Sequence, residues 1–147
     1  MKTLIFSMIL SLFAASALAA GTTPAAKTAP KTGAPAMSVS FVEPKDGATV
    51  PKTFKVVMAV TGMKIANAGQ EMDNKMAGHH HIIIDGGPVP PGQSIPNDAK
   101  HLHFGKGQTS TNVTLPPGKH TLTLQFASGG HDSYGPAMSK TITVNVQ

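Results

Sequence analysis

The stretch LPPGKHTLTLQFA, residues 115–127, carries the clearest β-strand pattern in this chain. After the Pro-Pro-Gly turn signal, the apolar side chains of Leu122, Leu124 and Phe126 alternate with polar ones. A period of two places apolar residues on one face of a strand and polar residues on the other. The segment therefore predicts a strand in a sheet that is buried on one face and solvated on the other.

Six further segments show strand patterns, and turn-forming residues separate them along the chain. They are MSVSFVEP (residues 37–44), TFKVVMAVT (53–61), HHHIIID (79–85), HLHF (101–104), TSTNVTL (109–115) and MSKTITVNV (138–146). No segment between them has the apolar spacing of an amphipathic helix. The pattern indicates an all-β fold, an immunoglobulin-like β-sandwich of about seven strands in a single domain over residues 37–147.

The N-terminal residues 1–20 have the composition of a secretory signal peptide. A positive start at Lys2 is followed by an apolar run over residues 4–14 and by an Ala-Leu-Ala cleavage pattern. This order of charge, apolar run and small residues is typical of an export signal. We expect cleavage near Ala19 or Ala20, and a mature protein that is periplasmic or secreted.

Residues 21–36 differ in composition from the strand-forming segments that follow. They are rich in Ala, Thr, Pro and Lys and have no apolar periodicity, which predicts a flexible linker. The apolar run of the signal is shorter than the about 20 residues of a transmembrane helix. We expect no membrane span.

The composition excludes several classes of site. The chain has no cysteine, which excludes disulfides, a blue-copper site and cysteine-based catalysis. The formal net charge is +5, yet every basic residue is a lysine, and proteins that read nucleic acids rely largely on arginine. We expect no nucleic-acid partner. The sequence contains neither a phosphate loop nor a nucleophile elbow, so a non-enzymatic role is favoured while an enzymatic one stays open.

The motif His-x-His occurs twice, as His79/His81 and as His101/His103. In a strand, residues i and i+2 point to one face about 6.5–7 Å apart, so two imidazoles can contact one metal ion. Each pair alone is as typical of a solvated strand end as of a ligand pair. Two such pairs in one small exported domain favour a metal site.

The topology decides whether the two pairs meet. If HLHF lies in the sheet opposite HHHIIID, the pairs are separated by the sandwich. If the two segments pair antiparallel, four outward histidines share one face, with His79 opposite His103 and His81 opposite His101. We favour the second arrangement, with His131 as an outlying ligand. Metal binding at such surface histidines is expected to weaken as the pH falls through about 6.5.

Two other histidines have a structural interpretation. His80 alternates in line with Ile82 and Ile84, which predicts a buried position on the inner face. His120 follows the Pro-Pro-Gly corner at the place where immunoglobulin-like domains commonly have a hydrogen-bonded tyrosine. We therefore expect both histidines to be structural and not to be metal ligands.

Methionines accompany the histidines. Met63, Met72 and Met76 lie in or near the loop before the histidine triplet, and Met138 follows His131. A thioether and imidazole set without thiolate suits copper. The alternative is that methionine fills gaps and tolerates surface positions.

The motifs HHHIIID, HFGKGQT, LPPGKHTLTL and PAMSKTITV occur in this order. The set resembles a family of small exported bacterial proteins catalogued as domain of unknown function 4399. The resemblance covers residues 37–147. It implies the fold and the exported location, and it implies no activity.

Three functions are open from the sequence. The first is an exported protein that binds copper or zinc through His79, His81, His101, His103 and His131. The second is a non-enzymatic binding or structural module that uses the loops at residues 61–78 and 86–100 on a protein or glycan partner. The third and weaker alternative is a copper-dependent redox enzyme, because copper–zinc superoxide dismutase also presents His-x-His on a strand.

Overall fold

A computed structural model describes residues 36–147 of the chain. Within this part, two β-sheets face each other. The described residues contain one 3-10 turn, at Pro136–Met138, and no α-helix. The predicted all-β sandwich is confirmed. The predicted signal peptide (residues 1–20) and all but the last residue of the predicted linker (residues 21–36) lie outside the described residues. No helix in the described part is long and apolar enough to cross a membrane.

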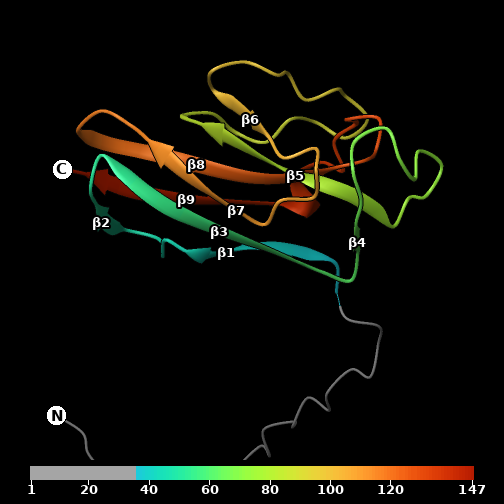
Figure 1. Ribbon diagram of the computed structural model, residues 1–147, viewed down its shortest axis with the longest axis horizontal. Helices are drawn as coiled ribbons and strands as arrows, with labels where there is room; N and C mark the ends of the chain where they lie inside the picture. The colour runs from blue at the N-terminus through green and yellow to red at the C-terminus, as the bar shows by residue number, and fades with distance from the viewer. Residues whose placement is uncertain (1–35) are drawn as a thin grey trace, which may run out of the picture. The chain divides into compact units, whose positions relative to one another are not determined.

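The smaller sheet has the strand order β1-β3-β7, with antiparallel pairing throughout. Its strands are β1 (Ser38–Glu43), β3 (Thr53–Thr61) and β7 (Ser110–Thr114). Phe54, Val56 and Met58 of β3 are buried, as their alternation with polar residues predicts. Figure 1 shows β1 and β3 in the lower layer of the sandwich.

The larger sheet has the order β2-β9-β8-β5-β4. Strand β6 also pairs with β5, further along that strand than β4 does. Its strands are β2 (Ala48–Val50), β9 (Ser139–Val146), β8 (Gly118–Ala127), β5 (Ala77–Ile84), β4 (Lys64–Ile65) and β6 (His101–His103). All seven predicted strands are present, and the short strands β2 and β4 were not predicted. Strands β5, β6, β8 and β9 correspond to the C, C′, F and G strands of an immunoglobulin-like sandwich.

The core lies between the inner faces of the two sheets. Ile82 of β5 and Leu122, Leu124 and Phe126 of β8 are fully buried there, together with Val56 of the facing sheet. Each such side chain stabilises the fold by about 1.5–3 kcal/mol relative to exposure. The apolar alternation of β8 therefore fixes which face of the larger sheet turns inward, and thereby which face carries His79 and His81.

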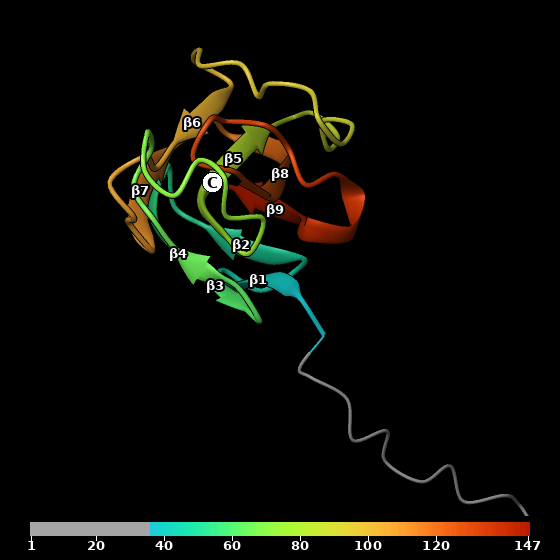
Figure 2. The ribbon, with the colours of Figure 1, turned by 90° about the vertical axis from the view of Figure 1, so that its right-hand side faces the viewer.

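Two loops cover part of the outer face of the larger sheet. The loop of residues 86–100, which joins β5 to β6, arches over this face (Figure 2). Two hydrogen bonds of 2.9 Å join it to the loop of residues 128–135. Gly92 N–H donates to the Ser133 carbonyl, and Ser133 N–H donates to the Gln93 carbonyl. Ile95 is 4% exposed beneath this cover. The outer face is therefore buried where the two loops meet.

Gln125, on the outer face of β8, joins the loop cover to the sheet. Its amide Nε2 donates to the Val89 carbonyl at 2.8 Å and lies 2.6 Å from Ser133 Oγ, while its Oε1 accepts from Val89 N–H at 2.8 Å. Gln125 is fully buried, and its register partner on β5 is His81. The two loops are thus held down directly beside the histidines of β5.

The hydrogen-bonded role expected for His120 is confirmed. Its Nε2 lies 3.0 Å from the carbonyl oxygen of Pro116, four residues upstream, and its Nδ1 lies 2.9 Å from Asp85 Oδ2. Asp85 also accepts the Thr121 N–H at 3.0 Å. His120 therefore holds the corner before β8 and the end of β5 together.

Candidate metal centre

Four histidines from three parts of the chain meet on the outer face of the larger sheet. His79 and His81 stand on β5, His103 ends β6, and His131 lies in the loop between β8 and β9. His79, His81 and His103 each offer one ring nitrogen, and these three nitrogens lie within 4.8 Å of one another. The ring centroid of His131 lies 4.7 Å from that of His103 and 5.1 Å from that of His79. We call these four residues the histidine centre.

The antiparallel pairing of β6 with β5 is confirmed, but the expected register is wrong by two residues. His103 pairs with His81, and His101 pairs with Ile83. His101 therefore stands one step further along the sheet, where its Nδ1 lies 2.8 Å from Asp98 Oδ1. The structure brings together four of the five histidines proposed as ligands and leaves His101 outside.

The expectation that these histidines lie at the surface is wrong for His79 and His81. His79 and His81 are fully buried, because the loops of residues 86–100 and 128–135 cover the outer face of the sheet. His103 and His131 are half-buried. The centre thus has a buried half on β5 and a more exposed half formed by β6 and the loop after β8.

Several ring nitrogens in the buried half have no hydrogen-bond partner among the described residues. These are Nδ1 of His79 and both nitrogens of His81. A buried polar group without a partner costs about 1–3 kcal/mol, and native proteins seldom leave such groups unpaired. The buried nitrogens are therefore available to a further atom.

The remaining nitrogens converge at short distances. His103 Nε2 lies 3.1 Å from both His79 Nε2 and His131 Nε2. A neutral imidazole nitrogen carries either one proton or one lone pair, so His103 Nε2 cannot make two ordinary hydrogen bonds at once. Tetrahedral ligands at zinc–nitrogen distances of 2.0–2.1 Å stand about 3.3 Å from one another. The spacing of the three nitrogens is close to that of neighbouring ligands around one ion.

The surroundings keep the buried rings neutral. Burial, reinforced by repulsion from His103 and His131, lowers the pKa of His79 to about 4. Burial and then the neighbouring histidines lower the pKa of His81 to about 3, and burial followed by His131 lowers the pKa of His103. Neutral imidazole is the form that binds metal ions. These shifts move the pH at which His79, His81 and His103 take up protons below the expected value of about 6.5.

His131 reaches the centre from a strained backbone. Its φ of 72° is in the left-handed region, which costs a residue with a Cβ about 1–2 kcal/mol. Its N–H donates to the Ser128 carbonyl at 2.9 Å, and its own carbonyl accepts from Ile95 N–H at 3.1 Å. Strain of this kind persists where the surrounding structure holds it and is frequent at functional sites.

His80 lies on the inner face, as its alternation with Ile82 predicts. It is fully buried, and its ring meets that of Phe126 edge to face with 5.0 Å between centroids. Both of its ring nitrogens lack a partner among the described residues. His80 therefore points away from the histidine centre, and burial lowers its pKa to about 4.

The methionines separate into two groups. Met138 is 4% exposed in the core and Met63 packs against the core, which makes them filling residues. Met72 and Met76 are 53% and 47% exposed. Of these four methionines, the exposed pair is accessible to a metal ion from solvent.

Sequence patterns did not reveal the residues that cover the centre. Gln125 and Ser133 hold the loops, and Ile95 is buried beneath them. The available signals were a single isoleucine in a polar, proline-rich loop and a long amide side chain on the outer face of a strand otherwise lined by threonine.

The comparisons with known proteins bear on the family and not on an activity. Among curated proteins, none matches this chain. The chain is similar to the X-ray structure of the endo-beta-1,4-mannanase from Thermotoga petrophila, with 17% sequence identity and a TM-score of 0.44. That similarity covers 76% of this chain, which spans 20% of the length of the mannanase chain. Residues 56–147 match the family described as Domain of unknown function (DUF4399). The chain therefore belongs to this family, as the motif resemblance predicted.

Proposed function

We propose that this protein is an exported metal-binding protein that holds copper or zinc in the histidine centre. The ligands are the imidazoles of His79, His81, His103 and His131. Among these residues the donors are nitrogen alone, and imidazole suits both copper and zinc. Export is proposed from the signal-like residues 1–20, and the compartment is a periplasm or the cell exterior.

One observation carries the proposal. His103 Nε2 stands 3.1 Å from two other Nε2 atoms, while the neighbouring buried nitrogens of His79 and His81 have no partner among the described residues. A set of protein hydrogen bonds cannot satisfy this arrangement, because each nitrogen has one proton or one lone pair. A single cation accepts one lone pair from each converging ring and removes the cost of leaving that lone pair unpaired, while the second nitrogen of each ring is not a ligand of the same ion.

The shape of the centre favours storage or delivery of the ion over catalysis. Four imidazoles can complete a tetrahedral shell, which is typical of closed sites, whereas catalytic zinc keeps a position open for water. The two loops over β5 further limit access of a substrate to the ion. A binding role without turnover is therefore the preferred form of the proposal.

The experiment is a titration of untagged, chelator-treated protein with Zn²⁺ and Cu²⁺, followed by calorimetry. The test variant is His79→Ala with His103→Ala, and the matched control is His101→Ala, whose ring is bound to Asp98 outside the centre. We expect one ion per wild-type chain and an unchanged affinity in the control. The metal affinity of the double variant should fall by more than about 10–100-fold, because loss of a hydrogen bond that only supports a ligand already costs about that much.

Circular dichroism of each variant tests whether it remains folded. Unchanged affinity in a folded double variant would contradict the proposal. Failure of the wild-type protein to bind either ion would do the same, and the role as a binding module for a protein or glycan would take its place.

A further inference from the structure

Met72 is a solvent-exposed thioether beside the histidine centre. It belongs to the loop of residues 66–76 and is 53% exposed, although methionine is among the residue types most often buried. The inner methionines of this chain fill the core, and Met72 does not. Met37 and Met76 are exposed as well, and Met72 differs from them in its contact with the segment that leads into His131.

The sulfur of Met72 lies against the two glycines that precede His131. A Cβ atom at Gly129 would be 3.5 Å from Met72 Sδ, and one at Gly130 would be 3.3 Å from Met72 Cε. Gly129 is pressed against the main chain of Gln70, since its Cβ would stand 2.0 Å from the Gln70 carbonyl oxygen. The absence of side chains at both glycines thus lets the thioether lie over the peptide that leads into His131.

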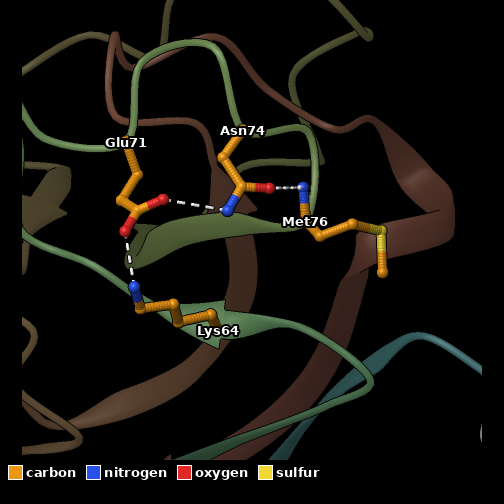
Figure 3. A network of polar contacts seen from close by, with 4 residues as sticks. All are labelled: Lys64, Glu71, Asn74 and Met76. Atoms are coloured by element: carbon orange, nitrogen blue, oxygen red, sulfur yellow. Dashed lines mark hydrogen bonds and ion pairs between the residues drawn. The ribbon is translucent and has the colours of Figure 1, made fainter.

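The main chain on either side of Met72 is held in place while its side chain is free to move. Figure 3 shows Glu71 bound to Lys64 and to the Asn74 amide, and Asn74 accepting the Met76 N–H. Asn74 N–H also donates to the Glu71 carbonyl at 2.9 Å, which closes a turn around Met72. Because methionine has three rotatable bonds, the sulfur can change its position without movement of the loop.

The donors form a gradient from the interior to solvent. The imidazoles of β5 are fully buried, those of His103 and His131 are half-buried, and Met72 is exposed. The more exposed half of the centre thus offers two imidazole nitrogens 3.1 Å apart, and the Met72 thioether lies against Gly129 and Gly130, which precede His131 in the chain. Thioether sulfur is a soft donor that selects Cu(I), while Zn²⁺ is held by imidazole, thiolate and carboxylate.

We propose that Met72, His131 and His103 form a Cu(I) site at the outer edge of the histidine centre. Zn²⁺ and Cu²⁺ take the imidazoles alone, and Cu(I) is drawn toward solvent by the sulfur. This inference rests on the proposed metal-binding function and specifies the form of copper that the exposed half accepts. Binding involves ligand exchange only, and the copper keeps its oxidation state.

The test compares Met72→Leu with Met76→Leu in the full mature chain. Met76 is a matched control because it belongs to the same loop and is 47% exposed. Each protein is loaded without oxygen with one equivalent of Cu(I), its affinity is measured by competition with a Cu(I) chelator, and X-ray absorption identifies the donor atoms. A Zn²⁺ titration is run in parallel on all three proteins.

We expect a sulfur neighbour at copper in the wild-type protein and in Met76→Leu, and nitrogen neighbours alone in Met72→Leu. The Cu(I) affinity of Met72→Leu should fall at least about tenfold while its Zn²⁺ affinity is unchanged, because zinc does not use the thioether. A copper site without sulfur in the wild-type protein would overturn this inference and leave the histidine centre standing. The same holds if sulfur persists in Met72→Leu or if both variants lose Cu(I) equally. Absence of both Cu(I) and Zn²⁺ binding in the wild-type protein would overturn the proposed function as well.

Discussion

The main chain of Gly105 lies directly against the imidazole of His103. A Cβ atom at position 105 would stand 2.4 Å from Cε1 and 2.5 Å from Nε2 of this ring, and 3.0 Å from the Ala68 Cβ. Real Cβ atoms do not approach other heavy atoms so closely, so only glycine leaves the ring where it is. Gly105 therefore acts as a positioning residue for His103.

Gly105→Ala should weaken metal binding without unfolding the protein. The added methyl group displaces the His103 ring from its neighbours, and a misplaced ligand is expected to reduce the Zn²⁺ affinity by roughly 10–100-fold, as loss of outer-shell support does. Gly87→Ala is the control, because a Cβ there meets nothing within 4 Å. Equal affinities in the two variants would show that the position of His103 does not matter for binding.

His131→Gly should separate stability from metal binding. Glycine adopts the left-handed conformation of this position, whose φ is 72°, without the about 1–2 kcal/mol that a Cβ costs there. We expect the metal-free His131→Gly protein to be more stable than His131→Ala by about 1 kcal/mol. Both variants should bind Zn²⁺ more weakly than the wild-type protein. Denaturant unfolding and metal titration measure the two quantities, and wild-type affinity in both variants would remove His131 from the ligand set.

The metal-free protein should become less stable as the pH falls from about 6.5 toward 4. In the folded chain, burial lowers the pKa values of His79 and His80 to about 4 and that of His81 to about 3. In the unfolded chain these histidines bind protons near pH 6.5. The unfolded state therefore takes up more protons in this window, and the free energy of unfolding decreases with acidification.

Melting temperatures in the presence of a chelator at pH 7.5, 6.5 and 5 check this expectation. Between these values the carboxylates of Glu71, Asp85 and Asp98, whose pKa values are lowered, stay ionised and do not contribute. A His80→Phe variant removes one buried imidazole and should show a smaller decrease. A melting temperature that stays constant from pH 7.5 to 5 would contradict the assignment of these rings as buried and neutral.

Gln125→Leu should loosen the cover of the histidine centre. The substitution removes the acceptor of the Val89 N–H at 2.8 Å, while the Val89 carbonyl keeps the Ser133 Oγ donor at 2.8 Å. An N–H left unpaired on burial costs roughly 1–3 kcal/mol. We expect faster proteolysis and faster hydrogen exchange in residues 86–100. Gln108→Leu is the control: its exposed side chain accepts only the Lys106 N–H at 2.9 Å, outside the cover, so residues 86–100 should behave as in the wild-type protein.

The strands were predictable where their patterns are long. Alternation of apolar and polar residues identified the six strands of five or more residues, because one face of each packs on the core. Of the three shorter strands, β6 was identified by the alternation in HLHF, whereas β2 and β4, with three and two residues, were not predicted. They exist because β9 and β5 offer parallel partners to them, which is a tertiary effect that no local pattern records.

The histidine centre was predictable in its faces and not in its register or its depth. The alternation of β5 correctly separated His79 and His81 from His80. The register of His103 depends on the path of residues 86–100, because no short turn fixes the pairing of β6 with β5. In the structure that path places His101 opposite Ile83. A strand pattern indicates which side chains leave the core and gives no information about the loops that later cover them.

The ligands of the histidine centre are far apart along the chain. Contacts between His79 and His103 and between His103 and His131 join positions 24 and 28 residues apart. A bound ion would close both loops at once, and closure of loops of this length by a covalent bridge removes entropy from the unfolded chain equivalent to about 3 kcal/mol or more. In a chain without cysteine, the ion would take the part that a disulfide plays in small domains that contain one. It would fasten the short edge strand β6 and the loop after β8 to the centre of the sheet, so that loss of the metal would loosen the fold at the place where the metal leaves.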